Sequence, residues 1–309
     1  MYDIIIIGCG PAGMTAGIYA ARANKKVLII EKETIGGQIS SSPLVENYPG
    51  YKEISGSELA NNMFEQVTAL GVDVELDEVK KIEYGKIKKV ITLDNVYESK
   101  AVIIATGSRY KLLGLKNEEN LIGNGIHFCV ACDGAFFKDK TVAVIGGGNS
   151  AVINAITLSD ICKKVYVIQI IDKLTAESTL VEKLKEKENV EIILNAKVTE
   201  LIGEDNLQAI KVNILNKVRE IKLDGMFISI GLIPQSDFVK ELLPINKYGY
   251  IESNNCVTEK DGIFVAGDCR DKQIRQLTVA TSDGTTAALD AIAYLNKGSL
   301  SNSGCDQKS

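Results

Sequence analysis

The sequence predicts an α/β protein of two Rossmann-like, three-layer domains, with the second domain inserted into the first. Two glycine-rich turns predict this class: Gly8-Cys9-Gly10-Pro11-Ala12-Gly13 and Gly146-Gly147-Gly148-Asn149-Ser150-Ala151. Each turn follows a short β-branched run and precedes a helical pattern, which is the order of a βαβ unit. The length of 309 residues is also sufficient for two domains that each bury a core.

The first βαβ unit begins at the N-terminus. We expect a buried strand over Tyr2–Ile7, a helix over Pro11–Ala23, and a second buried strand over Val27–Ile30 that ends at Glu31. Glu31 lies 23 residues after Gly8 (31 − 8).

The second unit repeats this plan. We expect a strand over Thr141–Ile145, a helix over Asn149–Ser159, and a strand over Val165–Ile168 that ends at Gln169. Gln169 lies 23 residues after Gly146 (169 − 146), so the offset agrees with that of the first unit. The sequence therefore predicts one plan used twice.

Each unit continues into alternating segments with turn signals, which predict a β-meander over 72–104 and another over 190–230. Both meanders lead into a buried strand closed by glycine, at 101–107 and 226–231. Before the first meander, Ser55-Gly56-Ser57-Glu58 predicts a capped helix that stops near Gly71.

The pattern changes after Pro234. Gly262–Asp268 predicts a further buried strand, and Leu277–Leu295 predicts a long helix rich in alanine and threonine. These segments have no counterpart in the second copy, so they most simply complete the first domain. We therefore assign residues 1–112 and 240–309 to the first domain and residues 113–239 to the second.

The composition is that of an ordinary soluble globular protein, with 24% charged and 45% hydrophobic residues. A formal net charge of −5 argues against nucleic acid or an anionic membrane as a general partner. No apolar run approaches the roughly 20 residues of a membrane span, and the chain opens directly into a strand pattern without a signal peptide. The seven cysteines are scattered, which is unlike a secreted disulfide framework and indicates the reducing cytoplasm.

The first glycine turn has the full context of a dinucleotide phosphate site. Its glycines permit close backbone approach, and the N-terminus of the following helix then faces a pyrophosphate. Glu31 is placed to accept hydrogen bonds from a ribose hydroxyl. The alternative is that the glycines serve only close packing of strand and helix.

A dithiol motif, Cys129-Val130-Ala131-Cys132-Asp133, lies between the two glycine turns. It suggests electrons passing from a bound nucleotide cofactor to a disulfide, which could pass them on by thiol–disulfide exchange. Asp133 is the natural proton donor and acceptor for that step. The alternative, half of a zinc site, lacks a second close pair of ligands, so no metal is expected.

Five other residues with reactive side chains are assigned less specific roles. His127, the only histidine, is open to two interpretations: it tunes the nearby thiolates, or it is packed and hydrogen-bonded. Cys9, Cys162, Cys256 and Cys269 are expected to be small buried residues.

The chain resembles the low-molecular-weight thioredoxin reductases across nearly its full length. The matching stretches are Gly8–Gly13, Glu31, Gly36-Gly37-Gln38, Glu46-Asn47-Tyr48-Pro49-Gly50, Ala105-Thr106-Gly107, Cys129–Asp133, Gly267-Asp268 and Arg275-Gln276-Leu277.

This resemblance implies two domains of the FAD/NAD(P)-binding type, with FAD held by the first copy and the C-terminal return segment. The implied cofactor-binding residues are Gly8, Gly10, Pro11, Ala12, Gly13, Glu31, Gly37, Gln38, Asn47, Ala105, Thr106, Gly107, Gly267, Asp268, Arg275, Gln276 and Leu277. Among them, Gly267-Asp268 would meet the ribityl and phosphate region, and Gln38, Asn47 and Gln276 would line the isoalloxazine.

The resemblance also implies the catalytic roles and the partners. It assigns Cys132 as the thiolate that faces flavin C4a. It assigns Cys129 as the sulfur that attacks the disulfide of thioredoxin, or of another thioredoxin-fold protein. A homodimer is implied in the same way.

The segment after the second glycine turn departs from the family. The family strand ends in His-Arg-Arg, with a third arginine four residues beyond the second, whereas here the register gives Gln169-Ile170-Ile171-Asp172-Lys173-Leu174-Thr175. Because such arginines bind the 2′-phosphate of NADPH through charge-assisted contacts, we expect that nicotinamide binding is lost. The alternatives are an NADPH site with a drifted sequence, and NADH use through a ribose contact from Gln169.

Another donor must then reduce the flavin. The pattern is most like the ferredoxin-dependent flavin thioredoxin reductases, a branch that keeps the fold and the dithiol without the NADPH motif. Potentials of about −400 mV for a plant-type ferredoxin and about −270 mV for thioredoxin leave a gap of about 130 mV. Over two electrons this gap is on the order of 6 kcal/mol downhill.

We therefore expect an FAD-dependent disulfide reductase that reduces thioredoxin with electrons from ferredoxin. The first rival is the same enzyme driven by NADPH or NADH. The second is a non-enzymatic redox sensor that reports oxidation of the dithiol to a partner.

Overall fold

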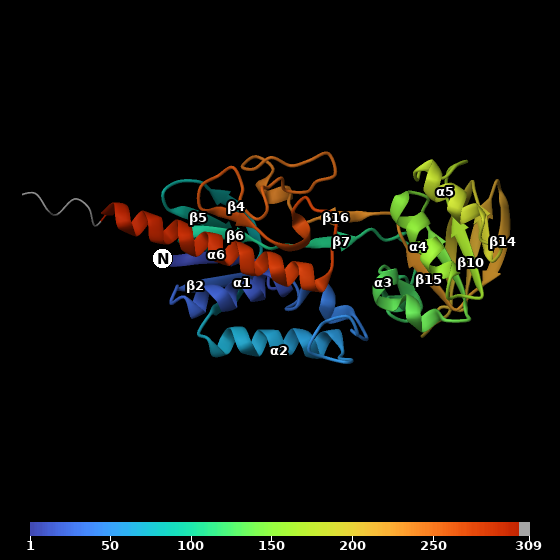
Figure 1. Cartoon of the computed structure of the whole chain (residues 1–309), viewed down its shortest axis with the longest axis horizontal. Helices are drawn as coiled ribbons and strands as arrows, with labels where there is room; N and C mark the ends of the chain where they lie inside the picture. The colour runs from blue at the N-terminus through green and yellow to red at the C-terminus, as the bar shows by residue number, and fades with distance from the viewer. Residues whose placement is uncertain (303–309) are drawn as a thin grey trace, which may run out of the picture. The chain divides into compact units, whose positions relative to one another are not determined.

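The computed structural model describes residues 1–302, and it divides them into two compact units (Figure 1). Unit 1 contains residues 1–109 and the chain from Ile233 onward, and unit 2 is the continuous segment Tyr110–Leu232 between them. Each unit has a parallel sheet at its centre with helices on one face. The predicted α/β fold, with one Rossmann-like domain inserted into the other, is confirmed.

The sheet of unit 1 is built around β1 (Tyr2–Ile7). β2 (Val27–Glu31) is parallel to β1, and β3 (Asp73–Leu76) is parallel to β2. On the other side of β1, the C-terminal half of β6 (Val96–Ile104) is also parallel, and β17 (Ile263–Val265) is parallel to β6. A strand from the C-terminal return segment therefore completes the parallel part of this sheet.

The antiparallel part of the same sheet contains β4 (Val79–Glu83), β5 (Lys88–Thr92) and the N-terminal half of β6. The expectation that the meander begins at residue 72 is wrong, because β3 is a parallel edge strand. Three of its four residues are exposed, so its sequence lacks the apolar run of a buried parallel strand.

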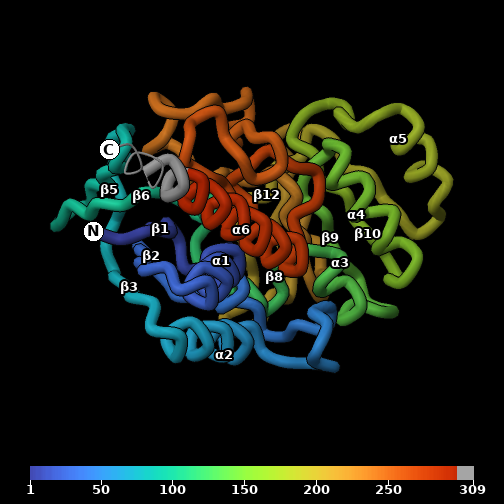
Figure 2. The backbone as a smooth tube through the Cα atoms, turned by 60° about the vertical axis from the view of Figure 1, so that its left-hand side comes forward, coloured from blue at the N-terminus to red at the C-terminus, as the bar shows by residue number. Residues whose placement is uncertain are grey.

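Helices α1 (Pro11–Arg22), α2 (Gly56–Ala69) and α6 (Leu277–Asn302) cover one face of this sheet, and α1 and α6 lie side by side (Figures 1 and 2). The alternation of β1 fits this layering. Ile4 and Ile6 pack in the core beneath the helices, whereas Ile5 and Ile7 pack in the core on the opposite face.

The capping box predicted before α2 is present at its N-terminus. The backbone N–H of Glu58 donates to the hydroxyl oxygen of Ser55 at 3.2 Å. Such a cap satisfies one of the free N–H groups of the first turn.

Unit 2 repeats the arrangement around β9 (Thr141–Ile145). Its parallel sheet has the order β11-β10-β9-β15-β8, where the other strands are β8 (Ile126–His127), β10 (Lys164–Ile168), β11 (Val190–Ile193) and β15 (Gly225–Ile228). β11, like β3, was expected in a meander and is instead parallel to its neighbour, β10.

The two faces of this second sheet are covered differently. Val142 and Val144 pack in the core with α4 (Asn149–Ser159) and α5 (Ser178–Lys185). Ala143 and Ile145 pack toward an antiparallel sheet formed by β12 (Ala196–Ile202), β13 (Ala209–Ile214) and β14 (Lys217–Lys222). A short helix of the same unit, α3 (Val130–Asp133), begins directly after Cys129.

Two short strands, β7 (Ser108–Tyr110) and β16 (Leu232–Pro234), pair with each other where the chain passes between the units. The sequence-based domain bounds lie at 112 and 239, whereas the structural division follows Arg109 and Leu232. The difference arises because the segment up to Val239 packs in unit 1. The 3-10 helices are η1 (Gly37–Ser41), η2 (Glu119–Leu121), η3 (Gly134–Phe137), η4 (Asp237–Val239) and η5 (Gly267–Cys269).

In the part of the chain that the structure describes, no helix has both the length and the apolar character needed to span a membrane.

Candidate functional site

The first glycine turn joins β1 to α1 in unit 1. Gly8 has a φ of +108°, and a Cβ atom there would lie 2.4 Å from the carbonyl oxygen of Ala105. A Cβ on Gly13 would lie 1.9 Å from the carbonyl oxygen of Gly8. Close packing therefore explains these two glycines, and no such demand applies to Gly10, whose Cβ would meet nothing nearer than 4.0 Å.

Glu31 stands at the C-terminal end of β2, beside this turn. Its Oε2 accepts a hydrogen bond from the backbone N–H of Cys9 at 2.7 Å, and its Oε1 accepts from the N–H of Glu33 at 2.9 Å. These bonds fix the carboxylate, and each oxygen keeps a second lone pair for a ligand hydroxyl.

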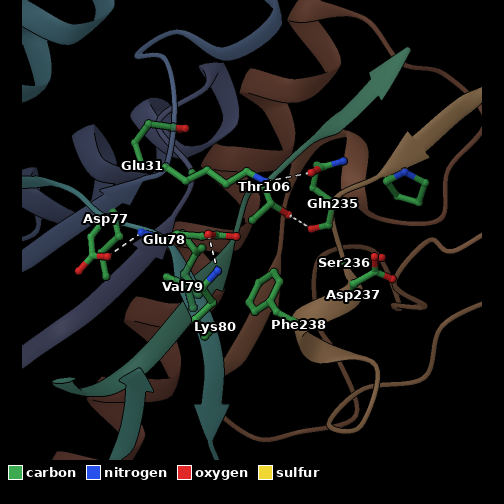
Figure 3. Close-up of a pocket in the computed structure, with 15 residues that line it drawn as sticks. Glu31, Asp77, Glu78, Val79, Lys80, Thr106, Gln235, Ser236, Asp237 and Phe238 are labelled. Atoms are coloured by element: carbon green, nitrogen blue, oxygen red, sulfur yellow. Dashed lines mark hydrogen bonds and ion pairs between the residues drawn. The ribbon is translucent and has the colours of Figure 1, made fainter. Parts of the chain in front are cut away.

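A cavity of about 240 Å³ opens at the C-terminal ends of β1, β2 and β6, next to Gly8 and Glu31 (Figure 3). Thr106, shortly after the end of β6, lines it and donates to the carbonyl oxygen of Gln235 at 2.5 Å. Lys32 also lines it and donates to the side-chain oxygen of Gln235 at 3.1 Å. Ligands of doubly wound sheets bind at this edge, and the cavity is large enough for only part of a dinucleotide.

The C-terminal return segment approaches the same turn through Gly267. This residue has a φ of +77°, and a Cβ there would lie 2.9 Å from the Cβ of Ala12 at the start of α1. Gly267-Asp268 therefore lies beside the helix N-terminus, where an anionic group would be favoured, and its contact with a phosphate stays a prediction.

Asp283, which the sequence analysis did not single out, anchors this return segment. It is buried in α6 and accepts from the N–H of Gly267 at 3.1 Å and from two nitrogens of Arg270 at 2.9 and 2.8 Å. The Nζ of Lys272 lies 3.0 Å from Asp283 and 3.0 Å from Asp268. Burial alone would raise the pKa of Asp283, but the hydrogen bond from Arg270 and the charge of Lys272 hold it below its usual range.

The residues assigned to the flavin ring lie on several segments of unit 1. Gln38 donates from its amide to the carbonyl oxygen of Ser108, and Asn47 is exposed. Gly37 packs near Gly10, and the carbonyl oxygen of Gly107 accepts from the N–H of Gln235 at 3.0 Å. The contacts of these residues with a flavin stay predictions.

Arg275 precedes Gln276 and Leu277 at the start of α6, and its guanidinium lies 4.0 Å from the ring centroid of Tyr250. Its buried Nε has no hydrogen-bond partner among the described residues. A buried donor of this kind is expected to have a partner, so it fits a site that takes an anionic or polar ligand.

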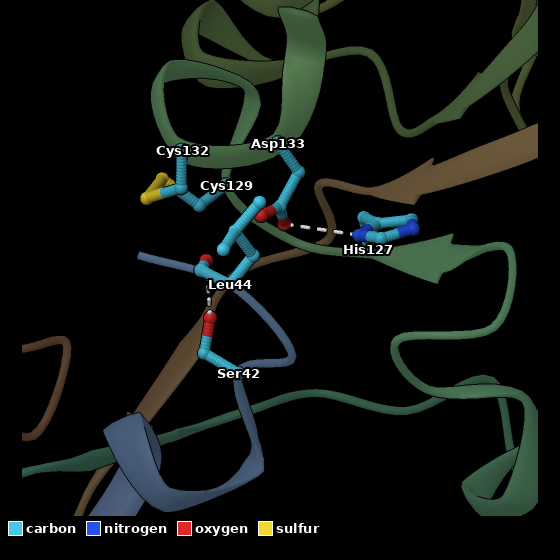
Figure 4. Close-up of a disulfide and its surroundings, with 6 residues drawn as sticks. All are labelled: Ser42, Leu44, His127, Cys129, Cys132 and Asp133. Carbon is cyan, nitrogen blue, oxygen red and sulfur yellow. Dashed lines mark hydrogen bonds and ion pairs between the residues drawn. A yellow bond between two sulfur atoms is a disulfide. The ribbon is translucent and has the colours of Figure 1, made fainter. Parts of the chain in front are cut away.

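The dithiol lies in unit 2, where Cys129 and Cys132 form a disulfide at the start of α3 (Figure 4). The Cα atoms are 5.2 Å apart, and the N–H of Asp133 donates to the carbonyl oxygen of Cys129 at 3.0 Å. The carboxylate of Asp133 lies 3.0 Å from the Nδ1 of His127. The structure thus brings the three predicted catalytic residues together and adds His127, which is packed and hydrogen-bonded.

The second glycine turn has the backbone geometry of the first. Gly146 has a φ of +131°, and a Cβ there would lie 2.5 Å from the carbonyl oxygen of Ser229. The carbonyl oxygen of Gly147 accepts from the N–H of Thr175 at 2.7 Å, as that of Cys9 accepts from Gly36 at 2.9 Å.

Gln169 follows β10, in the place that corresponds to Glu31 of unit 1, but its side chain has different hydrogen bonds. The amide of Gln169 donates to the carbonyl oxygen of Lys173 at 3.4 Å and accepts from the N–H of Ile170 at 3.1 Å. A Cβ on Gly147 would lie 2.5 Å from its Nε2. Gln169 is therefore packed on the turn and bonded within its own loop.

Four further thiols are buried, as predicted. Burial and the charge of Glu31 raise the pKa of Cys9 to about 12, and burial with the charge of Asp283 raises that of Cys256 to about 12. Burial raises the pKa of Cys162 to about 11. These thiols are poor nucleophiles at neutral pH. Among the described residues, no cluster of histidine, cysteine and carboxylate side chains could hold a metal ion.

Comparison with known proteins agrees with this site. A family model described as pyridine nucleotide-disulphide oxidoreductase matches residues 2–284. The "34.2 kDa protein in rubredoxin operon" of Clostridium pasteurianum is 43% identical over 298 residues, which are 95% of this chain and 97% of that protein. The thioredoxin reductase of Bacillus subtilis is 42% identical over 303 residues, which are 96% of each chain.

A solved structure is similar as well. The crystal structure of thioredoxin reductase from Streptococcus pyogenes matches with a TM-score of 0.92 and 41% identity, covering 96% of this chain and 99% of that one. The cofactor of this family is FAD, and the glycine turn, Glu31 and the adjoining cavity fit its dinucleotide part. The chain belongs to the pyridine nucleotide-disulphide oxidoreductase family, as an FAD-dependent disulfide oxidoreductase of the thioredoxin reductase type.

Proposed function

We propose that this protein reduces the disulfide of thioredoxin with electrons from reduced ferredoxin. FAD, when bound, supplies the means to collect single electrons and to deliver them as a pair. Overall, two reduced ferredoxins, one thioredoxin disulfide and two protons give two oxidised ferredoxins and one thioredoxin dithiol.

The Cys129–Cys132 pair performs the step in which thioredoxin is reduced. Two electrons open the disulfide, and Asp133 supplies a proton to it. The thiolate of Cys129 then attacks the thioredoxin disulfide to form a mixed disulfide, and Cys132 attacks the sulfur of Cys129 to release reduced thioredoxin. Each attack forms one S–S bond and breaks one.

The loop after β10 is the observation that supports ferredoxin as the donor. Ile170 and Ile171, which are 61% and 41% exposed, occupy positions where the family has arginines. Apolar side chains cannot compensate the charge of a 2′-phosphate, which charge-assisted hydrogen bonds from arginine would do.

Gln169 supports the same donor against NADH. Both ends of its amide are bonded within its own loop, so a ribose hydroxyl would have to replace an existing bond. Glu31, by contrast, keeps a free lone pair on each oxygen for the ribose of FAD.

Different relatives favour different electron donors. One is named for its place in a rubredoxin operon, and rubredoxins are small iron-containing carriers of single electrons. The relatives named thioredoxin reductase favour the rival, in which NADPH or NADH reduces the same flavin.

Anaerobic titration of the oxidised holoenzyme separates these donors. One equivalent of NADPH or NADH is expected to leave the flavin absorbance unchanged. Two equivalents of chemically reduced ferredoxin are expected to bleach it, and thioredoxin disulfide should then restore it. Rapid bleaching by stoichiometric NADPH would overturn the proposed donor. Purified protein without FAD, or without disulfide reduction by reduced ferredoxin, would favour the redox sensor.

Two cysteine variants test the step in which the dithiol reduces thioredoxin. Cys129→Ser and Cys132→Ser should each abolish thioredoxin reduction and keep FAD bound. Loss of FAD in Cys129→Ser would contradict the role given to that residue. The proposal also includes a homodimer in the cytoplasm, and sedimentation velocity of the holoenzyme checks the dimer.

A further inference from the structure

We propose that His127 is a positioning residue for Asp133, which it orients and whose carboxylate it stabilises by a hydrogen bond from Nδ1–H during disulfide reduction. This inference rests on the proposed function of the dithiol, and it assigns a role to a residue that neither the family resemblance nor the dithiol motif includes.

The backbone of His127 is fixed by the sheet of unit 2. His127 ends β8, two residues before Cys129, and it pairs in parallel register with Phe227 of β15. Asp133 stands on the other side of the dithiol, at the end of α3. The strand and the short helix thus hold the two residues on either side of the same pair of cysteines.

The ring of His127 is held by two aromatic neighbours. The edge of the ring meets Phe137, with centroids 5.1 Å apart and an interplanar angle of 75°, and Phe227 lies at 5.6 Å. Phe137 and Phe227 also contact each other edge to face at 5.3 Å. This packing leaves His127 only 6% exposed, so its ring cannot turn freely toward solvent.

Within this packing, Nδ1 of His127 points at the carboxylate of Asp133 (Figure 4). The two atoms are 3.0 Å apart, and the side chains are 6% and 12% exposed. A carboxylate in such surroundings is costly without a hydrogen-bonding partner, and the imidazole supplies one. Phe137 and Phe227 also strengthen the bond, because these apolar rings exclude competing water.

With Nδ1–H directed at Oδ2, the neutral ring of His127 donates a hydrogen bond to Asp133, and the proton that Asp133 gives to the disulfide is carried on Oδ1. When Asp133 gives its proton to the opening disulfide, an Nδ1–H group of His127 can donate to the carboxylate that remains. When the dithiol closes again, the proton returns to Asp133. Electrons are not involved in this transfer, and the charge left on Asp133 always faces a donor.

The test uses the FAD-loaded enzyme and dithiothreitol under anaerobic conditions. Dithiothreitol enters at the Cys129–Cys132 disulfide, so bleaching of the flavin reports transfer between dithiol and flavin without any ferredoxin or NADPH. His127→Leu is expected to slow this bleaching about tenfold or more, as is Asp133→Asn. His127→Asn, whose amide nitrogen takes the place of Nδ1, should recover most of the rate.

A double variant shows whether His127 acts through Asp133 or whether its loss only loosens the packing around the dithiol. If His127 acts through Asp133, His127→Leu/Asp133→Asn should bleach no more than about twofold slower than Asp133→Asn alone. Phe137→Leu serves as the matched control, because it loosens the same ring cluster and keeps both atoms of the hydrogen bond. It should stay within about threefold of the wild-type rate.

The outcomes distinguish this proposal from the proposed function. If dithiothreitol does not bleach the wild-type flavin, the link between dithiol and flavin fails and both proposals fall. If the wild type bleaches and His127→Leu bleaches within twofold of it, only the role of His127 is overturned. Equal slowing by Phe137→Leu and His127→Leu, or multiplied losses in the double variant, would also overturn it.

Discussion

A Cβ atom on Gly13 would lie 1.9 Å from the carbonyl oxygen of Gly8, inside the contact distance of any pair of atoms. Gly10, three residues earlier on the same turn, would place its Cβ 4.0 Å from its nearest neighbour, the carbonyl oxygen of Gly36. Gly13 is therefore required by the fold itself. Gly10 is required only by what approaches the turn.

This contrast predicts different defects for two alanine variants. Gly13→Ala should destabilise the apoprotein by roughly 2 kcal/mol or more, because α1 must move away from β1. Gly10→Ala should leave the thermal midpoint of the apoprotein near that of the wild type and weaken FAD binding. Thermal unfolding of the apoproteins and FAD titration by fluorescence check both. Equal destabilisation by the two changes would contradict this division.

Asp283 predicts a pH-dependent stability. Its pKa is lowered in the folded protein, so its contribution is present above the unfolded value of about 3.9 and is lost as pH falls through the folded value. Asp283→Asn leaves Arg270 and Lys272 without their shared carboxylate, at a cost of about 3 kcal/mol near neutral pH. Urea unfolding of the holoenzyme should show this difference at pH 7 and a smaller one below about pH 4.

Ser282→Ala is the matched control for that change, because Ser282 is the exposed neighbour of Asp283 on α6. It should alter the free energy of unfolding by less than about 0.5 kcal/mol. A difference for Asp283→Asn that does not change with pH would argue against the ionic role of the carboxylate.

The buried thiols predict a selective alkylation pattern. With a pKa of about 12, Cys9 and Cys256 carry very little thiolate at pH 8, so iodoacetamide should leave them unmodified in the folded protein. After gentle reduction, Cys129 and Cys132 should be modified. Peptide mass spectrometry measures each site, and the protein unfolded in guanidinium should be labelled at all of them. Rapid labelling of folded Cys9 would show that its turn opens.

The exposed isoleucines predict a gain of affinity for a phosphorylated nucleotide. Ile170→Arg/Ile171→Arg should strengthen binding of 2′,5′-ADP by roughly tenfold or more, because each arginine can form charge-assisted bonds to phosphate. Adding Thr175→Arg should increase the effect. Leu215→Arg/Val218→Arg is the control, since these residues are 73% and 65% exposed in the same unit. Calorimetry gives the affinities, and equal gains in both double variants would mean that only net charge matters.

The sequence predicts the central elements of both units well because their apolar runs are buried on both faces. β1 and β9 each sit between parallel neighbours, and a glycine turn follows each of them directly. β3 and β11 lie at sheet edges, where exposed residues in β3 and half-buried residues in β11 interrupt the pattern of a fully buried parallel strand. Their alternating sequences looked like the first strands of the meanders that follow them.

The site was predictable where a motif names its own residues, as at Cys129 and Cys132. Asp283 was not, because it is one acidic residue in a helix of alanine and threonine, and its partners lie eleven and thirteen residues away. The contact between His127 and Asp133 depends on how β8 and α3 flank the dithiol, which local pattern does not specify. The bonds of Gln169 within its own loop likewise follow from side-chain orientation alone.

Gly146 shows that a glycine-rich turn is weak evidence for a bound nucleotide. Its backbone passes so close to the carbonyl oxygen of Ser229 that any larger residue is excluded, whether or not a nucleotide ever approaches. Selection for a folded domain is thus enough to preserve such a turn after a ligand is abandoned. The glycines of the second turn therefore do not show by themselves that a nucleotide binds there, and the residues after the second strand have to be tested as well.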